Sequence, residues 1–554
     1  MVLGAAEIRL DTGLVDYVIL AIYFVAVLGI GFAAKRYIKT SLDYFLSGRS
    51  LPAWITGLAF ISANLGALEV LGMAANGAQY GVYTVHYYWI GAVPAMVFLG
   101  IVMMPFYYGS KVRSVPEYLR LRFNKPTHLF NALTFAFATV LIAGVNLYAL
   151  ALVLKLMLGW PILLGIVVAA AVVLAYITLG GLSSAIYNEV LQFFVILAAL
   201  IPLTIVGLHK VGGWDGLKEA THKVNSKDEL FHSWVGTGIG HVDNPLGASW
   251  VPIVFGLGFV LSFGYWTTNF AEVQRALSAK SLSAAQRTPL IGAYPKALIP
   301  AITIIPGLVA LATVPGLGGD DPNLQYNNAI PLLMNEFLPN GMLGIALAGL
   351  LAAFMAGVAA NVSAFNTVVT YDLWEPYVRS GESDAYYLRF GRIATVTGIV
   401  IGIGTALIAS GYNNIMDYIQ LLFSFFNAPL FATFIIGMYW KRMTPWAGLW
   451  GLVAGTIGAA VAHYGDSWDV FSLGSPQAAA FWGAIAAFVA DAVVSVGVSM
   501  FTQPKPIEEL QGLVHGMANE AEALSLEEQA WYRKPSTLAI GVLGIVLVLS
   551  IIFW

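Results

Sequence analysis

Long apolar stretches separated by short polar loops make up most of this chain. Each stretch is close to the roughly 20 apolar residues that an α-helix needs to cross a lipid bilayer. The stretch at 331–372 is too long for one crossing, so part of it should form a separate helix beside a loop. The pattern predicts an all-α membrane protein with about fourteen transmembrane helices, near 15–35, 53–75, 80–108, 127–158, 160–179, 188–208, 250–271, 288–314, 331–372, 388–411, 415–439, 446–463, 477–502 and 537–554.

Composition supports this prediction and narrows the possible chemistry. Of the 554 residues, 58% are hydrophobic and only 10% are charged, whereas soluble domains carry roughly 25% charged residues. The chain has no cysteine, which excludes thiol and disulfide chemistry. Its net charge of −3 gives no indication of a nucleic-acid partner. The expected surroundings are therefore a lipid bilayer.

Lysine and arginine concentrate in alternate loops, namely the first, third, seventh, ninth and eleventh. Basic loops of membrane proteins face the cytoplasm. We therefore expect a multi-pass protein of the plasma (inner) membrane with both termini outside the cytoplasm.

Two predicted helices are interrupted by glycine and polar residues. The first interruption is Ser62–Gly66, and the second, five spans later, is Ser262–Asn269. Matching interruptions in two halves of a chain are typical of inverted-repeat transporters, in which unwound backbone contacts ion and solute. Two ordinary packing kinks remain an alternative, since glycine is common in membrane helices.

Two ionisable residues fall inside predicted spans. Lys296 lies in the apolar stretch Leu290–Leu311, and Glu69 lies in an early span. A lysine at mid-membrane costs about 2.5–3.5 kcal/mol on insertion scales, so it usually faces a cavity or a bundle interior. We hypothesise that the two residues form an ion pair across a cavity. If they are unpaired, Lys296 could bind an anionic solute or Glu69 could carry a proton.

Several segments, taken in order, resemble the sodium/solute symporter family, and in particular its bacterial sodium/glucose–galactose branch. They are DYFLSGRSLP at 43–52, PEYLRLRFN at 116–124, GGLSSAIYNE at 180–189, QRALSAKS at 274–281 and YWKR at 439–442. The resemblance implies a LeuT-like 5+5 inverted-repeat core at about 50–440. One extra N-terminal helix (13–37) and three extra C-terminal helices (445–554) would complete a single transporter domain over 1–554.

The resemblance also implies a solute site. Asn64, Tyr87, Lys296 and Gln420 keep the residue types that the family uses around sugar hydroxyls, whereas Glu69, Tyr88 and Ser262 differ from the usual residues. By the same comparison, Met73, Tyr87 and Met416 would form an outer gate and Tyr265 an inner one. A sugar is the favoured solute, and an organic acid, an amino acid or another polar metabolite remains open.

The coupling ion is the point at which the chain departs most from the family. The implied sodium ligands are the backbone carbonyls of Ser62, Leu65 and Ala353 and two side-chain hydroxyls that are replaced here by Ala356 and Gly357. Losing two oxygen ligands should weaken a site for a hard cation; the Ser62 hydroxyl could restore one. Glu189 matches an acidic residue on the exit path. Sodium is favoured, with proton coupling or uncoupled transport as alternatives.

Other classes of protein lack support in the sequence. There is no His-Glu-x-x-His pattern, Gly-x-Ser-x-Gly context or phosphate-binding loop, so an enzyme is not expected. No cofactor is expected either. The sequence predicts an ion-coupled symporter of a small polar solute that works by alternating access, as a monomer or a weak dimer. A channel or a nutrient sensor stays possible at this point.

Overall fold

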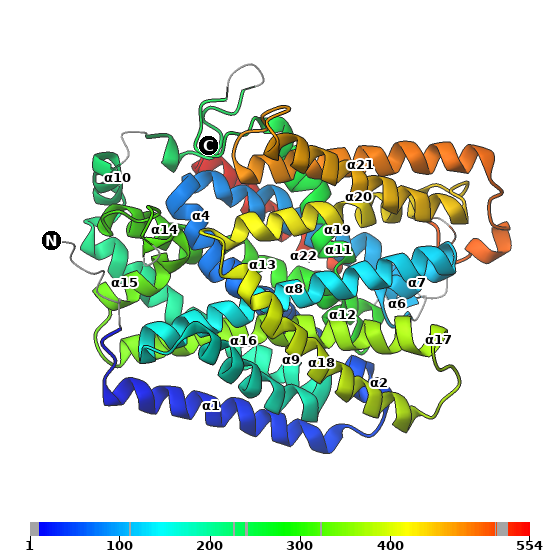
Figure 1. Ribbon diagram of the computed structural model, residues 1–554, viewed down its shortest axis with the longest axis horizontal. Coiled ribbons are helices and arrows are strands. Elements are labelled where there is room, and N and C mark those ends of the chain that lie inside the picture. Colours follow the sequence, from blue (N-terminus) through cyan, green and yellow to red (C-terminus); the bar gives the residue numbers. More distant parts are fainter. Residues whose placement is uncertain are drawn as a thin grey trace.

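The computed structural model describes residues 10–109, 112–224, 228–238, 242–321, 324–515, 517 and 530–554. These residues form helices and no strand, apart from one isolated bridge between Leu51 and Ala279. Most of the long helices run side by side in one bundle (Figure 1). The all-α prediction is therefore confirmed for the described residues.

Apolar helices account for most of the bundle. Among the described residues, eleven helical segments are long and apolar enough to cross a membrane, and two further pairs of shorter helices pass that test together. They overlap the predicted stretches, as does the shorter apolar helix Ile162–Ala175. Fourteen crossings remain a prediction. The long helices are α1 (Leu14–Ala34), α8 (Lys125–Leu158), α9 (Ile162–Lys210), α13 (Leu282–Leu298), α14 (Pro300–Thr313), α16 (Met342–Val368), α18 (Asp384–Ala409), α19 (Ile415–Tyr439), α20 (Pro445–Ser467), α21 (Pro476–Phe501) and α22 (Pro535–Ile552).

Two helices are broken where the sequence predicts interruptions. The first consists of α3 (Ala53–Asn64) and a segment that resumes at Leu68, with a bend of 58° between them. The second consists of the π-helical turn η8 (Pro252–Ser262) with α11 (Phe263–Thr268), followed by α12 (Phe270–Leu277) after a bend of 49°. The long stretch at 331–372 is also divided as expected, into α15 (Ala329–Phe337) and α16. Each break leaves backbone groups free of helical hydrogen bonds in the middle of the bundle.

The chain reverses direction within α9. Gly181 has a φ of +52°, and a Cβ atom there would lie 2.6 Å from the Tyr44 carbonyl oxygen. Only glycine tolerates that combination. The two ends of α9 lie at one end of the bundle, since Gly165 packs on Ala151 near the end of α8 and Gly207 packs near Phe337 of α15.

Both ends of the described chain lie at this same end of the bundle. The Leu10 amide donates to the Leu156 carbonyl (2.8 Å), and the Ser233 amide, in the segment after α9, donates to the Phe553 carbonyl (3.0 Å). The first and last described residues therefore lie on one side of the bundle. Which side of the membrane they face stays a prediction.

Candidate solute-binding site

A central cavity lies beside the two broken helices. Side chains from seven parts of the chain reach it, including both broken helices, α8, α13, α16 and α19. Its lining residues are Ala63, Asn64, Gly66, Leu68, Glu69, Tyr87, Ala92, Ile142, Asn146, Leu257, Leu261, Ser262, Tyr265, Trp266, Lys296, Gly357, Asn361, Met416, Gln420 and Phe423. Six of the seven predicted solute-binding residues line this space, which we call the central cavity below.

 These six are Asn64, Glu69, Tyr87, Ser262, Lys296 and Gln420, of which Tyr87 is also predicted for the outer gate. The seventh, Tyr88, does not line the cavity but donates a hydrogen bond to Glu69.

Lys296 of α13 forms the centre of the polar part of the cavity. Its ammonium group donates hydrogen bonds to a carboxylate oxygen of Glu69 and to the Asn64 side-chain oxygen. It also lies over the rings of Tyr88 (4.7 Å to the centroid) and Trp266 (5.1 Å), an arrangement that stabilises a cation. The hypothesis that Glu69 and Lys296 form a pair is confirmed.

Tyr88 holds the second oxygen of Glu69. Its hydroxyl donates to Glu69 Oε2 at 2.6 Å, and Glu69 itself lies in a π-helical turn, η3 (Leu68–Gly72), immediately after the first break. With both carboxylate oxygens bonded and the lysine paired, this part of the cavity is electrically neutral. Among the described residues that line the cavity, no cation is left unpaired for an anionic solute.

Two amide oxygens that line the cavity lack partners. Gln420 Oε1 and Asn361 Oδ1 are buried without a hydrogen-bond partner among the described residues. Buried acceptors of this kind are costly unless something donates to them. They are therefore suited to a solute that brings its own hydroxyl donors.

Tyr265 lies between the cavity and a carboxylate that the sequence analysis did not identify. Its hydroxyl donates to Glu272 Oε1 (2.6 Å) and accepts from Asn64 Nδ2 (3.0 Å). Its ring packs against Phe423, with centroids 4.9 Å apart. Glu272 follows the second break by three residues, and an acidic residue so close to an interrupted apolar stretch was the signal that could have identified it.

The residues predicted as the outer gate are only partly brought together. Tyr87 and Met416 line the cavity, whereas the buried Met73 does not. The Tyr87 hydroxyl donates to Gln477 Oε1 (2.7 Å), and Gln477 Nε2 donates to Asn76 Oδ1 (2.6 Å). Gln477 lies on α21, outside the predicted core, so no sequence pattern indicated a role for it.

Asn146 of α8 occupies the space between the first broken helix and α16. A Cβ atom added at Gly66 or at Gly357 would overlap its carboxamide oxygen. That oxygen accepts a hydrogen bond from the Ala67 amide at 2.9 Å. An amide oxygen therefore lies beside Gly357, where the family resemblance predicts a missing hydroxyl.

The other residues predicted for the sodium site are buried around the same region. Leu65 is at the break, Ala353 and Ala356 are in α16, and the Ser62 hydroxyl has no hydrogen-bond partner among the described residues. Glu189 forms a fully buried ion pair with Arg275. The described residues hold no group of three or more His, Asp or Glu side chains that could bind a metal ion.

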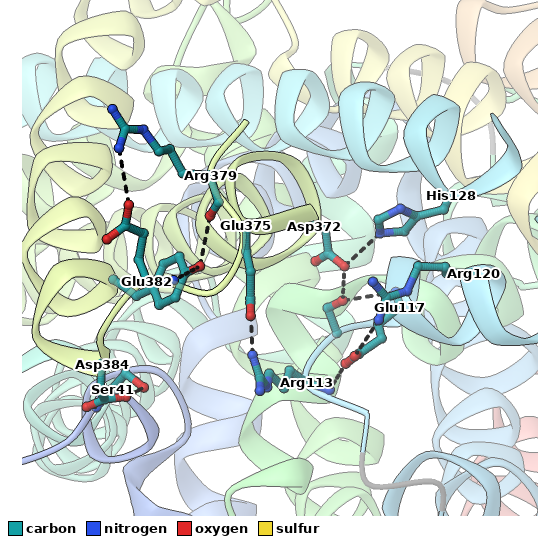
Figure 2. A network of polar contacts seen from close by, with 12 residues as sticks. Ser41, Arg113, Glu117, Arg120, His128, Asp372, Glu375, Arg379, Glu382 and Asp384 are labelled. Carbon is teal, nitrogen blue, oxygen red and sulfur yellow. Dashed lines mark hydrogen bonds and ion pairs between the residues drawn. The ribbon is translucent and has the colours of Figure 1, made fainter. Parts of the chain in front are cut away.

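A second polar network (Figure 2) lies around the start of α7 (Val115–Arg122), which Figure 1 shows at the opposite end of the bundle from α15. Asp372 Oδ1 contacts the Ser114 hydroxyl (2.8 Å) and His128 Nε2 (3.0 Å). Nearby, Arg113 pairs with Glu375 at 3.1 Å. The network links the segment before α7, the start of α8 and the end of the α16 span.

The fold and the cavity together define a class: a multi-pass membrane protein with two broken helices around one central polar cavity, as in inverted-repeat transporters. Residues 44–455 match the sodium:solute symporter family. Because this match covers most of the chain, the protein belongs to that family.

Solved structures show the same fold. A Na⁺-coupled sialic acid symporter superposes with a TM-score of 0.72 at 19% identity, covering 89% of this chain and 100% of that one. A transporter of the nucleobase-cation-symport-1 family gives a TM-score of 0.54 at 14% identity, covering 85% and 97%. The LeuT-like fold is therefore confirmed.

Similar proteins of known name include two cotransporters. The sodium/glucose cotransporter of Vibrio parahaemolyticus is 27% identical over 464 residues, which is 79% of this chain and 83% of that protein. The human sodium/myo-inositol cotransporter 2 is 29% identical over 476 residues, covering 80% and 68%.

Proposed function

We propose that this protein is a secondary active transporter that moves a small, hydroxyl-rich solute, with a sugar favoured, together with Na⁺ by alternating access. The observation that carries the proposal is the character of the central cavity. It joins a neutral Glu69–Lys296 pair with the free acceptor oxygens of Gln420 and Asn361. A neutral polyol can satisfy these acceptors without bringing an unpaired charge.

Family membership supports sodium as the co-transported ion. Hard cations take neutral oxygen ligands, and the Ser62 hydroxyl and the Asn146 carboxamide offer two near the first break. Together with the carbonyls of Ser62, Leu65 and Ala353, they form the proposed sodium site. In this site the side-chain oxygens come from Ser62 and Asn146 and not from hydroxyls at positions 356 and 357.

Each part of the cavity has a role in the proposed cycle. Tyr87 and Met416 close the cavity towards the termini, and Tyr265 closes it towards Glu272. Arg113, Arg120 and Arg379 all belong to the polar network of Figure 2, and under the positive-inside rule their charges support a cytoplasmic location for that end. In this proposal the protein lies in the plasma membrane, and the solute and sodium enter from the Tyr87 end. It acts as a transporter and not as an enzyme.

Uptake by purified protein in proteoliposomes tests the proposal. The panel contains radiolabelled glucose, myo-inositol, a dicarboxylate and an amino acid, each with an inward Na⁺ or K⁺ gradient. We expect a Na⁺ gradient to drive uphill uptake of a sugar or polyol. Q420A should raise the KM for that solute about threefold to tenfold, the effect of one neutral hydrogen bond.

Gln511 provides the matched control, since it is exposed and lies far along the chain from the cavity. Q511A should transport like the wild type. Saturable uptake that is restricted to the dicarboxylate or the amino acid, or a KM unaffected by Q420A, would contradict the proposed solute class.

A further inference from the structure

Glu272 is a buried carboxylate near the cavity that forms no ion pair with a described residue. Three carboxylates are buried in this region of the described chain, and two cations face them. Glu69 pairs with Lys296, and Glu189 pairs with Arg275. Glu272 is 2% exposed and forms no ion pair with a described residue. A fully ionised site would therefore hold one surplus negative charge.

The two cations nearest Glu272, Arg275 and Lys296, donate their hydrogen bonds to other groups. Arg275, on the same helix, directs Nε and Nη2 to Glu189 and Nη1 to the Ala271 carbonyl (2.7 Å). Lys296 of α13 donates to Glu69 and Asn64. Only the Tyr265 hydroxyl of α11 donates to Glu272, at Oε1, and the buried Oε2 has no partner among the described residues.

Burying an ionised carboxylate without a counter-ion costs free energy. Removing an ionised carboxyl group from water is strongly unfavourable unless a cation or several donors compensate, and a buried group then becomes neutral instead. One hydrogen bond from a phenol does not replace a counter-ion. With this burial and these partners, Glu272 is therefore expected to be protonated in the conformation described here.

The geometry points to Glu272 as a proton-binding site of this transporter, loaded while the cavity is open on one side and emptied on the other. This inference rests on the proposed function, because the proton is counted as cargo beside the solute. It adds a second driving ion to the sodium proposed above.

Tyr265 provides a direct route for the proton. As the Tyr265 O–H bond breaks and an O–H bond forms on Glu272 Oε1, the phenol oxygen takes a proton from a hydronium ion in the cavity. The hydronium becomes water, the phenol is restored, and the charge on Glu272 changes from −1 to zero. No other reactant is needed.

Protonation couples to transport through the closed conformation. Closure removes water from both the central cavity and Glu272, so it favours a bound solute and a neutral carboxyl group together. By linkage, each then strengthens binding of the other by the same factor.

The first test measures glucose and myo-inositol uptake in proteoliposomes with equal Na⁺ on both sides and an inward gradient of about one pH unit. The wild type should accumulate the transported solute up to about tenfold, because one pH unit is a tenfold proton ratio. E272Q, which keeps the shape of a protonated side chain, should show no accumulation. E336Q, which removes an exposed carboxylate on α15, should behave like the wild type.

The second test does not depend on finding the solute. Infrared difference spectra of the purified protein between acid and alkaline buffer should contain a carboxyl C=O band that is missing in E272Q and shifted in Y265F. E336Q should retain it. Absence of such a band in the wild type, its persistence in E272Q, or unchanged proton-driven accumulation by E272Q would each overturn the inference.

The two tests also separate this inference from the proposed function. If no solute on the panel is transported but the Glu272 band is found, the proposed function fails and the proton site stands. If Na⁺-driven sugar uptake is found without a Glu272 band, the proposed function stands and the proton site is rejected.

Discussion

Glu69 and Lys296 show that two oppositely charged side chains can lie in the membrane interior when they pair with each other. Their mutual contact, the Tyr88 hydroxyl and the Asn64 oxygen satisfy both groups. The pair differs from an exposed salt bridge, such as Arg379–Glu382, because its side chains are only 2% and 11% exposed, against 63% and 35% for the surface pair. Replacing either residue should therefore strongly change the contribution of the other to the stability of the protein.

We predict that K296M and E69L each destabilise the protein by about 3–5 kcal/mol, since each leaves one buried charge without its partner. The double variant E69L/K296M should regain most of that stability while remaining inactive in transport. Thermal unfolding of the purified variants in detergent measures this coupling in a double-mutant cycle. Additive losses in the double variant would show that the pair is not the stabilising unit.

At the scale of elements, the packing of α8 on α16 and on the first broken helix decides what can lie beside the break. Gly66 and Gly357 leave room for the Asn146 carboxamide and for nothing larger. The Asn146 amide oxygen therefore occupies the space that a hydroxyl side chain at position 357 would need, and either group could supply an oxygen ligand there. Substitutions at these positions should be interdependent.

We predict that G357S alone disrupts folding or lowers the Tm, because its side chain would overlap Asn146. N146A should weaken Na⁺ stimulation of uptake, and N146A/G357S should restore folding and Na⁺ stimulation, because it exchanges an amide oxygen for a hydroxyl oxygen. Uptake as a function of Na⁺ concentration measures the effect. Undiminished stimulation in N146A would exclude Asn146 as a sodium ligand.

The elements also show what the sequence could and could not predict. Both helix breaks were predictable, because glycine and polar residues interrupt otherwise apolar stretches there. The Lys296–Glu69 contact was expected because neither charge is tolerable alone. Asn146 and Gln477 were not predicted, since their importance depends on helices that pack together from 79 and 401 residues away along the chain.

At the scale of the whole molecule, the two ends of the bundle are closed differently. Towards the end near the termini, Tyr87, Gln477 and Asn76 form a hydrogen-bonded cluster of phenol and amide groups, and Gln477 also donates to the Asp417 carboxylate. The other end is held by the ionic network of Figure 2, in which Asp372 joins His128 and Ser114. In alternating access, these two sets of contacts must open in turn, so weakening one should favour the conformation open at that end.

We predict that D372A shifts the protein towards the conformation open at the Figure 2 end. The chain has no cysteine, so S363C introduces a single thiol at a position on α16 that is 2% exposed in this conformation. A membrane-impermeant maleimide should label S363C several-fold faster in the D372A background. R379A removes an exposed ion pair at the same end, and because such pairs contribute little, labelling should stay at the S363C rate. Equal labelling of S363C with and without D372A would mean that Asp372 does not hold this end closed, and the network of Figure 2 would then be a feature of folding and not of the transport cycle.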